Sequence, residues 1–179
     1  MPDTLSPPSG IGQPAPKGLA ARIVGVIFSP GETYQAVAAY PRILGVLALT
    51  TILMAAGVVS FLSLDVGMNA VLDQQVQVME SLRIDLPDQV YDRIEATAPR
   101  QRYYAGGSLL VMSPLICGVV AGIMLLIFNV VMGSDATFKQ AYAIVAHSQV
   151  LLVVQQMFIL PLNYVRETMA SGTTLAVFV

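Results

Sequence analysis

Residues 106–133 read GGSLLVMSPLICGVVAGIMLLIFNVVMG, a stretch without a charged side chain. As an α-helix that rises about 1.5 Å per residue, roughly 20 of these residues would cross the hydrocarbon core of a bilayer, which is about 30 Å thick. A helix in the core of a soluble protein rarely stays apolar on every face over such a length. The stretch therefore predicts a membrane-spanning helix, and the rest of the chain can be placed around it.

The composition of the whole chain agrees with a membrane protein. Hydrophobic residues make up 55% of the sequence and charged residues 11%, whereas soluble domains contain about 25% charged residues. The net charge of −2 leaves no basic surface for phosphates, so nucleic acid is not an expected partner. The single cysteine, Cys117, has no second thiol for an internal disulfide or a metal site, and we predict that it packs in the core.

Further apolar stretches lie on both sides of this one. The predicted spans cover residues 43–64, 106–132 and 142–162, and the apolar residues from 173 could begin a further span. The first of these stretches is too long and too late for a cleaved signal peptide. We therefore predict an all-α fold, a polytopic transmembrane helical bundle whose membrane domain covers residues 42–179.

The residues before the first span divide into a tail and a helical part. Residues 1–18 are rich in Pro, Gly and Ser and predict a disordered tail. In residues 19–41, apolar side chains recur at a spacing of four from Leu19 onward, which is typical of an amphipathic helix at the membrane surface. We predict interfacial helices here; the alternative is a juxtamembrane linker that folds back on the bundle.

A helix start is recognisable inside this segment. Ser29 as the N-cap, Pro30 at the first helical position and Glu32 three residues after the cap form a capping box. Tyr34 then lies on the apolar side of the predicted helix, and Pro41 ends it before the first span.

Residues 65–105 carry many charged side chains and predict an acidic extramembrane helical segment. Pro87 opens its second helix and Pro99 ends it. The acidic residues are spread over two helices and form no DxDxDG-type loop, so we expect no calcium or other metal site.

The second span contains two recognisable motifs. Ser113-Pro114 lies inside the apolar stretch and predicts a kink or an irregular first turn. Gly118 and Gly122 form a GxxxG pattern, which suits close packing of helices. We expect this packing within the molecule more than between two copies.

The third span is unusually polar for a membrane helix. At about 100° per residue, most of its polar side chains fall within an arc of about 120°. This polar intramembrane face consists of His147, Ser148, Gln149, Gln155, Gln156 and Asn163. Such groups must face other helices or water, so we interpret them as hydrogen-bonding groups inside the bundle. The alternative is a solute path. A Ser–His nucleophile is disfavoured because adjacent residues of a helix point about 100° apart.

Two segments resemble the Yip family, the Ypt/Rab-interacting membrane proteins. Residues 27–49, IFSPGETYQAVAAYPRILGVLAL, are similar to the family's SP-x-E segment before the first span. Residues 136–161, ATFKQAYAIVAHSQVLLVVQQMFILP, are similar to its later TF-K/R-Q segment. By this resemblance, the positions that matter for partner binding are Ser29, Pro30, Glu32, Pro41, Phe138 and Gln140, to which we add Tyr34 on the capped helix.

The resemblance implies a bundle of about five membrane helices with a cytoplasmic N-terminus and no catalytic residues. It identifies the chain as a prokaryotic-type, C-terminally shortened member, which would lie in the inner (plasma) membrane. The charges do not decide the orientation, since basic residues are almost equally divided between the two sides. One side carries Lys17, Arg22, Arg42 and Lys139, and the other carries Arg83, Arg93, Arg100, Arg102 and Arg166.

We therefore predict a non-enzymatic membrane scaffold or adaptor without cofactor or metal. Its partners would be the lipid bilayer and a membrane protein or a second copy of the chain. The alternative is a small transporter or channel component that uses the polar face of the third span.

Overall fold

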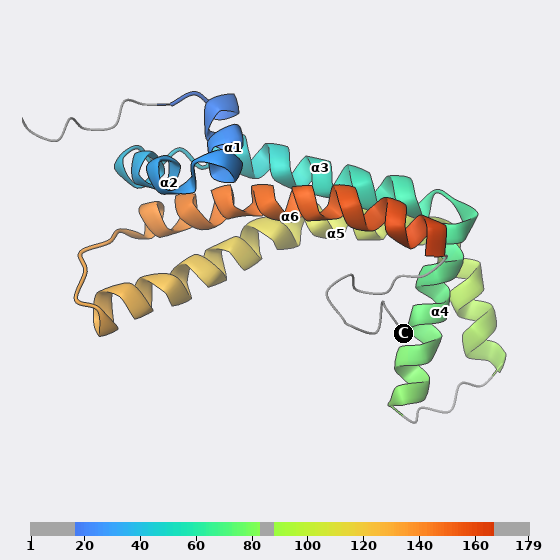
Figure 1. The fold of residues 1–179 in the computed structure, drawn as a ribbon. Coiled ribbons are helices and arrows are strands. Elements are labelled where there is room, and N and C mark those ends of the chain that lie inside the picture. Colours follow the sequence, from blue (N-terminus) through green and yellow to red (C-terminus); the bar gives the residue numbers. More distant parts are fainter. Residues whose placement is uncertain (1–16, 83–87, 167–179) are drawn as a thin grey trace, which may run out of the picture.

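The computed structural model of the chain describes residues 17–82 and 88–166, and every regular element in these ranges is a helix. Three long helices lie side by side, and two short helices cover one end of them (Figure 1). At the other end, a further helix and the beginning of one long helix project from the bundle. The prediction of an all-α transmembrane bundle is confirmed. The predicted tail up to residue 16 and the apolar residues from 173 lie outside the described ranges.

The long helices are α3 (Leu44–Leu62), α5 (Asp88–Leu126) and α6 (Phe138–Arg166), and each packs against the other two. The stretches long and apolar enough to cross a membrane are α3, residues Pro99–Val131 and α6. Only 28%, 17% and 28% of their respective apolar stretches is buried inside the protein. Because apolar surface of this extent is unstable in water, the outward faces of these helices are suited to lipid.

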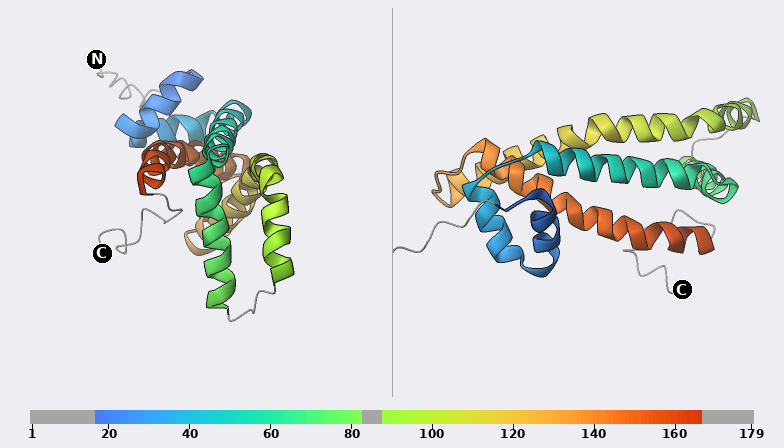
Figure 2. Two further views of the ribbon diagram at one scale, coloured as in Figure 1. Left: turned by 90° about the vertical axis from the view of Figure 1, so that its right-hand side faces the viewer. Right: turned by 90° about the horizontal axis from the view of Figure 1, so that it is seen from above.

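Two short helices, α1 (Leu19–Phe28) and α2 (Pro30–Ala39), pack against each other and against α6. Figure 2 shows them at the end of the bundle where α3 and α6 begin. Helix α1 buries Gly25 and Val26, whereas Phe28 is 81% exposed. The two helices thus fold back on the bundle, and the exposed apolar side of α1 is suited to the lipid headgroup region.

Helix α4 (Asp65–Ser81) lies beside the beginning of α5 (Figure 1). The expectation that a short helix ends at Pro99 is wrong, because α5 continues without interruption from Asp88 to Leu126. A proline inside a helix removes one backbone hydrogen bond but need not stop the helix when packing holds both sides. Helix α4 leads away from the bundle, and the beginning of α5 returns beside it (Figure 1). The remainder of α5 runs along α3, so the helix changes direction in between.

Two other prolines also lie inside helices. Helix α5 continues through Pro114, and α6 continues past Pro161 to Arg166. Pro161 therefore does not end the third span. The Tyr142 hydroxyl donates to the Pro114 carbonyl at 2.9 Å, so a neighbouring helix supplies a hydrogen bond at this point of α5.

The capping box predicted at the turn between α1 and α2 does not form. Helix α2 begins at Pro30, but the Ser29 side chain makes no capping hydrogen bond. The Ser29 N–H donates to the Gly25 carbonyl at 2.9 Å, so Glu32 cannot accept a hydrogen bond from it. The Glu32 carboxylate instead lies 3.7 Å from the Lys17 ammonium. Ser29 ends one helix and begins the next, and this double role leaves no room for the reciprocal cap.

Helix α5 ends in a π-helix, η1 (Ile127–Val131), which was not predicted. The Asn129 side chain accepts from the Ser134 hydroxyl at 2.8 Å and from the Ala136 N–H at 3.1 Å, and it donates to the Ala136 carbonyl at 2.9 Å. Gly133 has a φ of +68°, in the left-handed region that glycine adopts without strain. These hydrogen bonds and this glycine stabilise the turn that connects η1 to α6, which then runs back along α5.

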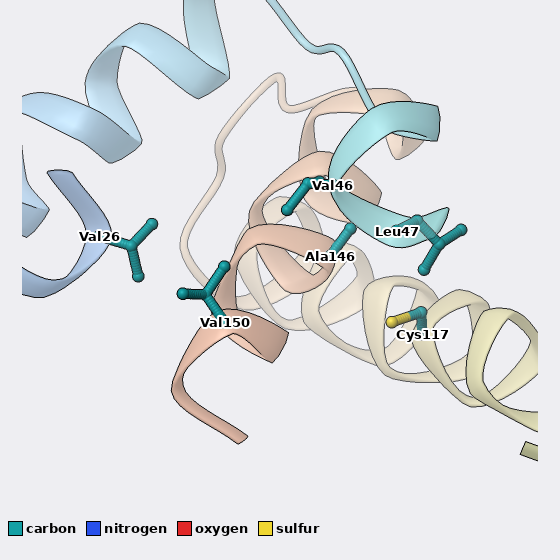
Figure 3. Close-up of a cluster of buried hydrophobic side chains, with 6 residues drawn as sticks. All are labelled: Val26, Val46, Leu47, Cys117, Ala146 and Val150. Carbon is teal, nitrogen blue, oxygen red and sulfur yellow. The ribbon is translucent and has the colours of Figure 1, made fainter. Parts of the chain in front are cut away.

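The buried cluster in Figure 3 draws side chains from four helices. Its members are Val26 of α1, Val46 and Leu47 of α3, Cys117 of α5, and Ala146 and Val150 of α6. Cys117 is 2% exposed and has a free thiol, as predicted for a packing residue. The cluster joins α1 to the three long helices, which fixes the position of the short helices on the bundle.

Gly25 is expected to be essential for the contact between α1 and α2. A Cβ atom at this position would overlap the Oγ1 atom of Thr33, and both residues are buried. We predict that Gly25→Ala lowers the free energy of unfolding by about 1–3 kcal/mol. The measurement is thermal unfolding of the purified chain in detergent.

A matched substitution and a rescue make this test specific. Gly31→Ala should leave the melting temperature unchanged or raise it, because no atom lies within 4 Å of the added methyl group. Adding Thr33→Ala to Gly25→Ala should restore most of the loss. If Gly25→Ala melts like the native chain, the two helices do not approach this closely.

Candidate functional site

The lead-in segment, residues 29–41, contacts the first half of α6, and we call this region the lead-in contact. The hydroxyls of Tyr34 and Ser148 lie 3.0 Å apart across a sequence separation of 114 residues. The Gln140 amide donates to the Ala38 carbonyl at 3.1 Å across a separation of 102 residues. Two segments distant in the sequence thus form one surface at the end of the bundle.

Gln140 has a second role at the start of α6. Its side-chain oxygen accepts from the Thr137 N–H at 2.9 Å and from the Thr137 hydroxyl at 2.8 Å. The Gln140 N–H in turn approaches the Thr137 hydroxyl at 3.4 Å. This reciprocal arrangement is a capping box, so the same side chain begins α6 and holds the end of α2. The pattern Thr-x-x-Gln in the sequence indicates such a capping box, but this cap was not predicted.

The remaining positions highlighted by the resemblance divide into two groups. Pro41 and Phe138 both line a groove between the start of α3 and the start of α6. Ser29, Pro30 and Glu32 lie at the turn between α1 and α2, where the Glu32 side chain is 80% exposed. The structure thus joins the two signature segments through Tyr34 and Gln140, and it places the other three residues at an exposed turn.

Three buried polar atoms near this contact have no hydrogen-bond partner among the described residues. They are Nη2 of Arg22, Oγ1 of Thr33 and Nε2 of His147. The Arg22 Nε atom donates to the Lys17 carbonyl at 2.9 Å. Burial of the guanidinium, and secondarily the charge of Arg42, lowers the pKa of Arg22. The burial of Arg22 and Thr33 was not predicted, because it depends on how α1 and α2 pack against each other and against α6.

Gln149 lies at the centre of the predicted polar face and is 8% exposed. Its carbonyl accepts from the Thr50 hydroxyl of α3 at 3.0 Å. Its amide donates to the Ser113 hydroxyl and to the Cys117 sulfur of α5, both at 2.9 Å. The Ser113 and Thr51 hydroxyls lie 3.2 Å apart. One carboxamide thus joins all three long helices where water is excluded, so its hydrogen bonds are not replaced by solvent.

The other residues of the polar face have different surroundings. Gln156 donates to the Met54 carbonyl at 3.0 Å, beside Gly57 of α3. The Ser148 hydroxyl lies 3.0 Å from the Ile144 carbonyl of its own helix. Asn163 is buried and Gln155 is exposed. The residues of the predicted polar face therefore differ in burial and in their hydrogen-bond partners.

The structure also shows which small residues of α5 lie at the helix contact. A Cβ atom at Gly118 would lie 3.5 Å from the Tyr142 ring, and one at Gly122 would meet nothing within 4 Å. Cys117 and Ala121 are buried at 2% and 0% exposure. Together with Ser113 they form a second row at a spacing of four, one position away from the GxxxG pattern. The sequence contained this row, but only the neighbouring helices distinguish it from the glycine row.

The described ranges contain no hydrogen-bonded pair of His147 and Ser148 and no metal-binding group. His147 is fully buried, and its Nδ1 atom lies 2.7 Å from the Ala143 carbonyl. Since a carbonyl only accepts, Nδ1 carries the proton in this hydrogen bond. Among the described residues no hydrogen bond joins His147 to Ser148. No group of three or more His, Cys, Asp or Glu in these residues could hold a metal ion.

Replacement of Gln149 should destabilise the bundle measurably. Gln149→Leu removes three hydrogen bonds between helices, each worth about 0.6 kcal/mol on average in a membrane protein. We expect a loss of about 1–2 kcal/mol in reversible unfolding by SDS in mixed micelles. Gln155→Leu, at an exposed position of the same helix, should change stability by less than about 0.5 kcal/mol. Equal effects at both positions would contradict a special role of Gln149.

The two roles of Gln140 can be separated by substitution. Gln140→Glu keeps an oxygen for the cap of α6 but cannot donate to the Ala38 carbonyl. One hydrogen bond is worth about 1 kcal/mol, so backbone amides of α2 should exchange about fivefold faster with deuterium in this variant. Gln140→Ala should in addition accelerate exchange in the first turn of α6. Unchanged exchange of α2 in both variants would show that this hydrogen bond does not hold the helix.

The family model of the Yip1 domain matches residues 24–179 of the chain. The matched range includes residues 27–49 and 136–161, the two segments that meet in the lead-in contact. A search of curated proteins and a search of solved structures gave no match. Since the matched range covers most of the sequence and all three long apolar helices, the chain is an integral, multi-pass membrane protein that belongs to the Yip1 domain family.

Proposed function

We propose that the chain is a non-enzymatic membrane adaptor whose α1–α2 unit binds a partner protein at the membrane surface. The observation that carries this proposal is the lead-in contact, where Tyr34 and Gln140 hold α2 against α6. A flexible linker would not need two hydrogen bonds to residues more than 100 positions away. The contact gives the short helices a defined orientation, which a recognition surface requires.

The turn between α1 and α2 is the part of this unit that a partner can reach. Phe28 is 81% exposed, and the Glu32 side chain is 80% exposed. Aromatic side chains are enriched at protein interfaces, so exposed Phe28 is the residue of this turn best suited to anchor a partner. The position at the end of the bundle also leaves the sides of α3, α5 and α6 to lipid.

The hydrogen bonds of Gln149 favour a structural role of the polar face over a transport path. Both ends of its carboxamide bind side chains of α3 and α5, so neither end is available to a passing solute without breaking the bundle. If Gln149→Leu combined with Gln156→Leu reduced solute flux into liposomes, the transport function would regain support. We further propose a cytoplasmic N-terminus and a plasma-membrane location, which follow from the family resemblance.

Photo-crosslinking from the exposed turn tests the adaptor function. A photoreactive amino acid replaces Phe28 in the full chain, in native membranes, and the adducts are identified by mass spectrometry. We expect one dominant membrane-protein adduct, or an adduct with a second copy of the chain. Adding Gln140→Ala should reduce its yield severalfold, because α2 then loses its hydrogen bond to α6.

A probe at Val165, which is 78% exposed near the far end of α6, provides the control and should not give the same adduct. Capture of lipid alone from Phe28 would contradict the adaptor function and leave α1–α2 as a membrane anchor. The same protein adduct from Phe28 and from Val165 would show that the captured protein does not bind the α1–α2 unit specifically, which would also contradict the proposal.

A further inference from the structure

A groove of about 620 Å³ lies between the start of α3 and the start of α6. Pro41 and Phe138 form part of its wall, and both were highlighted by the resemblance without a physical role. The groove also contains two basic side chains, Arg42 just before α3 and Lys139 in the first turn of α6. It thus lies where two membrane-spanning helices begin, at the level expected for lipid headgroups.

The two cations have no acidic partner in the described ranges. No acidic side chain lines the groove, and the ion pair seen at this end joins Lys17 to Glu32 instead. Buried Arg22 adds a third positive charge, and Arg42 contributes to the lowered pKa of Arg22. Arg22 and Arg42 are therefore close enough to affect one another, and positive charges without a carboxylate partner would be stabilised by an anion from outside the chain.

The rest of the groove is lined by apolar residues, some of which are exposed. Leu44, at the first turn of α3, is 82% exposed, and Phe138 is 49% exposed. The Tyr142 ring, which contacts the Phe138 ring at a centroid distance of 5.8 Å, continues the apolar wall along α6. A soluble anion would use only the basic end, whereas a phospholipid matches both the basic end and the apolar wall.

We infer that this groove binds one anionic phospholipid. Its phosphate lies between Arg42 and Lys139, and an acyl chain follows Leu44 and Tyr142 into the bilayer. This lipid site does not depend on the adaptor function, because the groove involves the starts of α3 and α6 and not the exposed turn of α1–α2. It gives Arg42 and Lys139 a binding role.

Tryptophan fluorescence provides a direct test, because the chain contains no tryptophan. Leu44→Trp places one fluorophore at the groove, in the full chain reconstituted in phosphatidylcholine vesicles. Quenching by dibrominated phosphatidylglycerol is compared with quenching by dibrominated phosphatidylcholine. We expect the anionic lipid to bind at least about fivefold more strongly, since each basic residue near the surface contributes by about that factor.

Two variants assign the preference to the groove. Arg42→Gln with Lys139→Gln should reduce the ratio of the two binding constants to about 1. Arg100→Gln with Arg166→Gln removes two exposed charges from the other end of the long helices and should leave the ratio unchanged. A tryptophan in place of Phe158, an exposed position of α6 outside the groove, should report no preference. Salt should weaken the preference of the Leu44→Trp chain, a readout that needs no further substitution.

Three outcomes would overturn the inference. The first is the absence of a preference at Leu44→Trp, and the second is a preference that survives loss of both Arg42 and Lys139. The third is a change in the fluorescence of the Leu44→Trp chain with inorganic phosphate but with neither brominated lipid, which would identify free phosphate as the occupant.

Discussion

The hydrogen bonds of the Gln149 carboxamide are the interaction on which the three-helix arrangement depends. They join α6 to the Thr50 hydroxyl of α3 and to the Ser113 hydroxyl and Cys117 sulfur of α5. Inside a bilayer an unpaired amide is costly, so the helices must meet at a register in which all these groups have partners. Apolar packing alone would permit several registers, because lipid and apolar side chains are nearly equivalent neighbours.

Small residues allow the helices to come close enough for these hydrogen bonds. Ala121 of α5 and both Ala143 and Ala146 of α6 are fully buried. The outward faces carry large apolar side chains instead, such as Met157 at 70% exposure. Small and hydrogen-bonded polar side chains thus lie inside the bundle beside the apolar cluster, and large apolar side chains cover its outside. A soluble helical bundle has polar side chains on its outside instead.

Helix α6 also organises the end of the molecule that carries α1 and α2. Gln140 caps α6 and binds the end of α2. About two turns further along α6, the Ser148 hydroxyl contacts the Tyr34 hydroxyl. The same end holds the groove with Arg42 and Lys139. A protein-binding turn and a lipid-binding groove would then share one membrane surface, so the bound lipid and the bound partner would both contact the region where the spans begin. This arrangement suits a protein that binds a partner and lipid at the membrane surface and does not catalyse a reaction.

The sequence by itself determined the all-helical membrane class, the three long apolar helices and the family, because charge-free length and local motifs are properties of the chain alone. Tertiary structure decided which polar groups meet. Only the packing of α1 and α2 against each other and against α6 buried Arg22 and Thr33. Only the neighbouring helices placed Cys117 and Ala121, rather than the adjacent glycines, at the buried positions of α5. The physical reason is that a side chain's partner in a helical bundle depends on the rotation and register of two helices. That relation involves residues 100 or more positions apart, and no local pattern contains it.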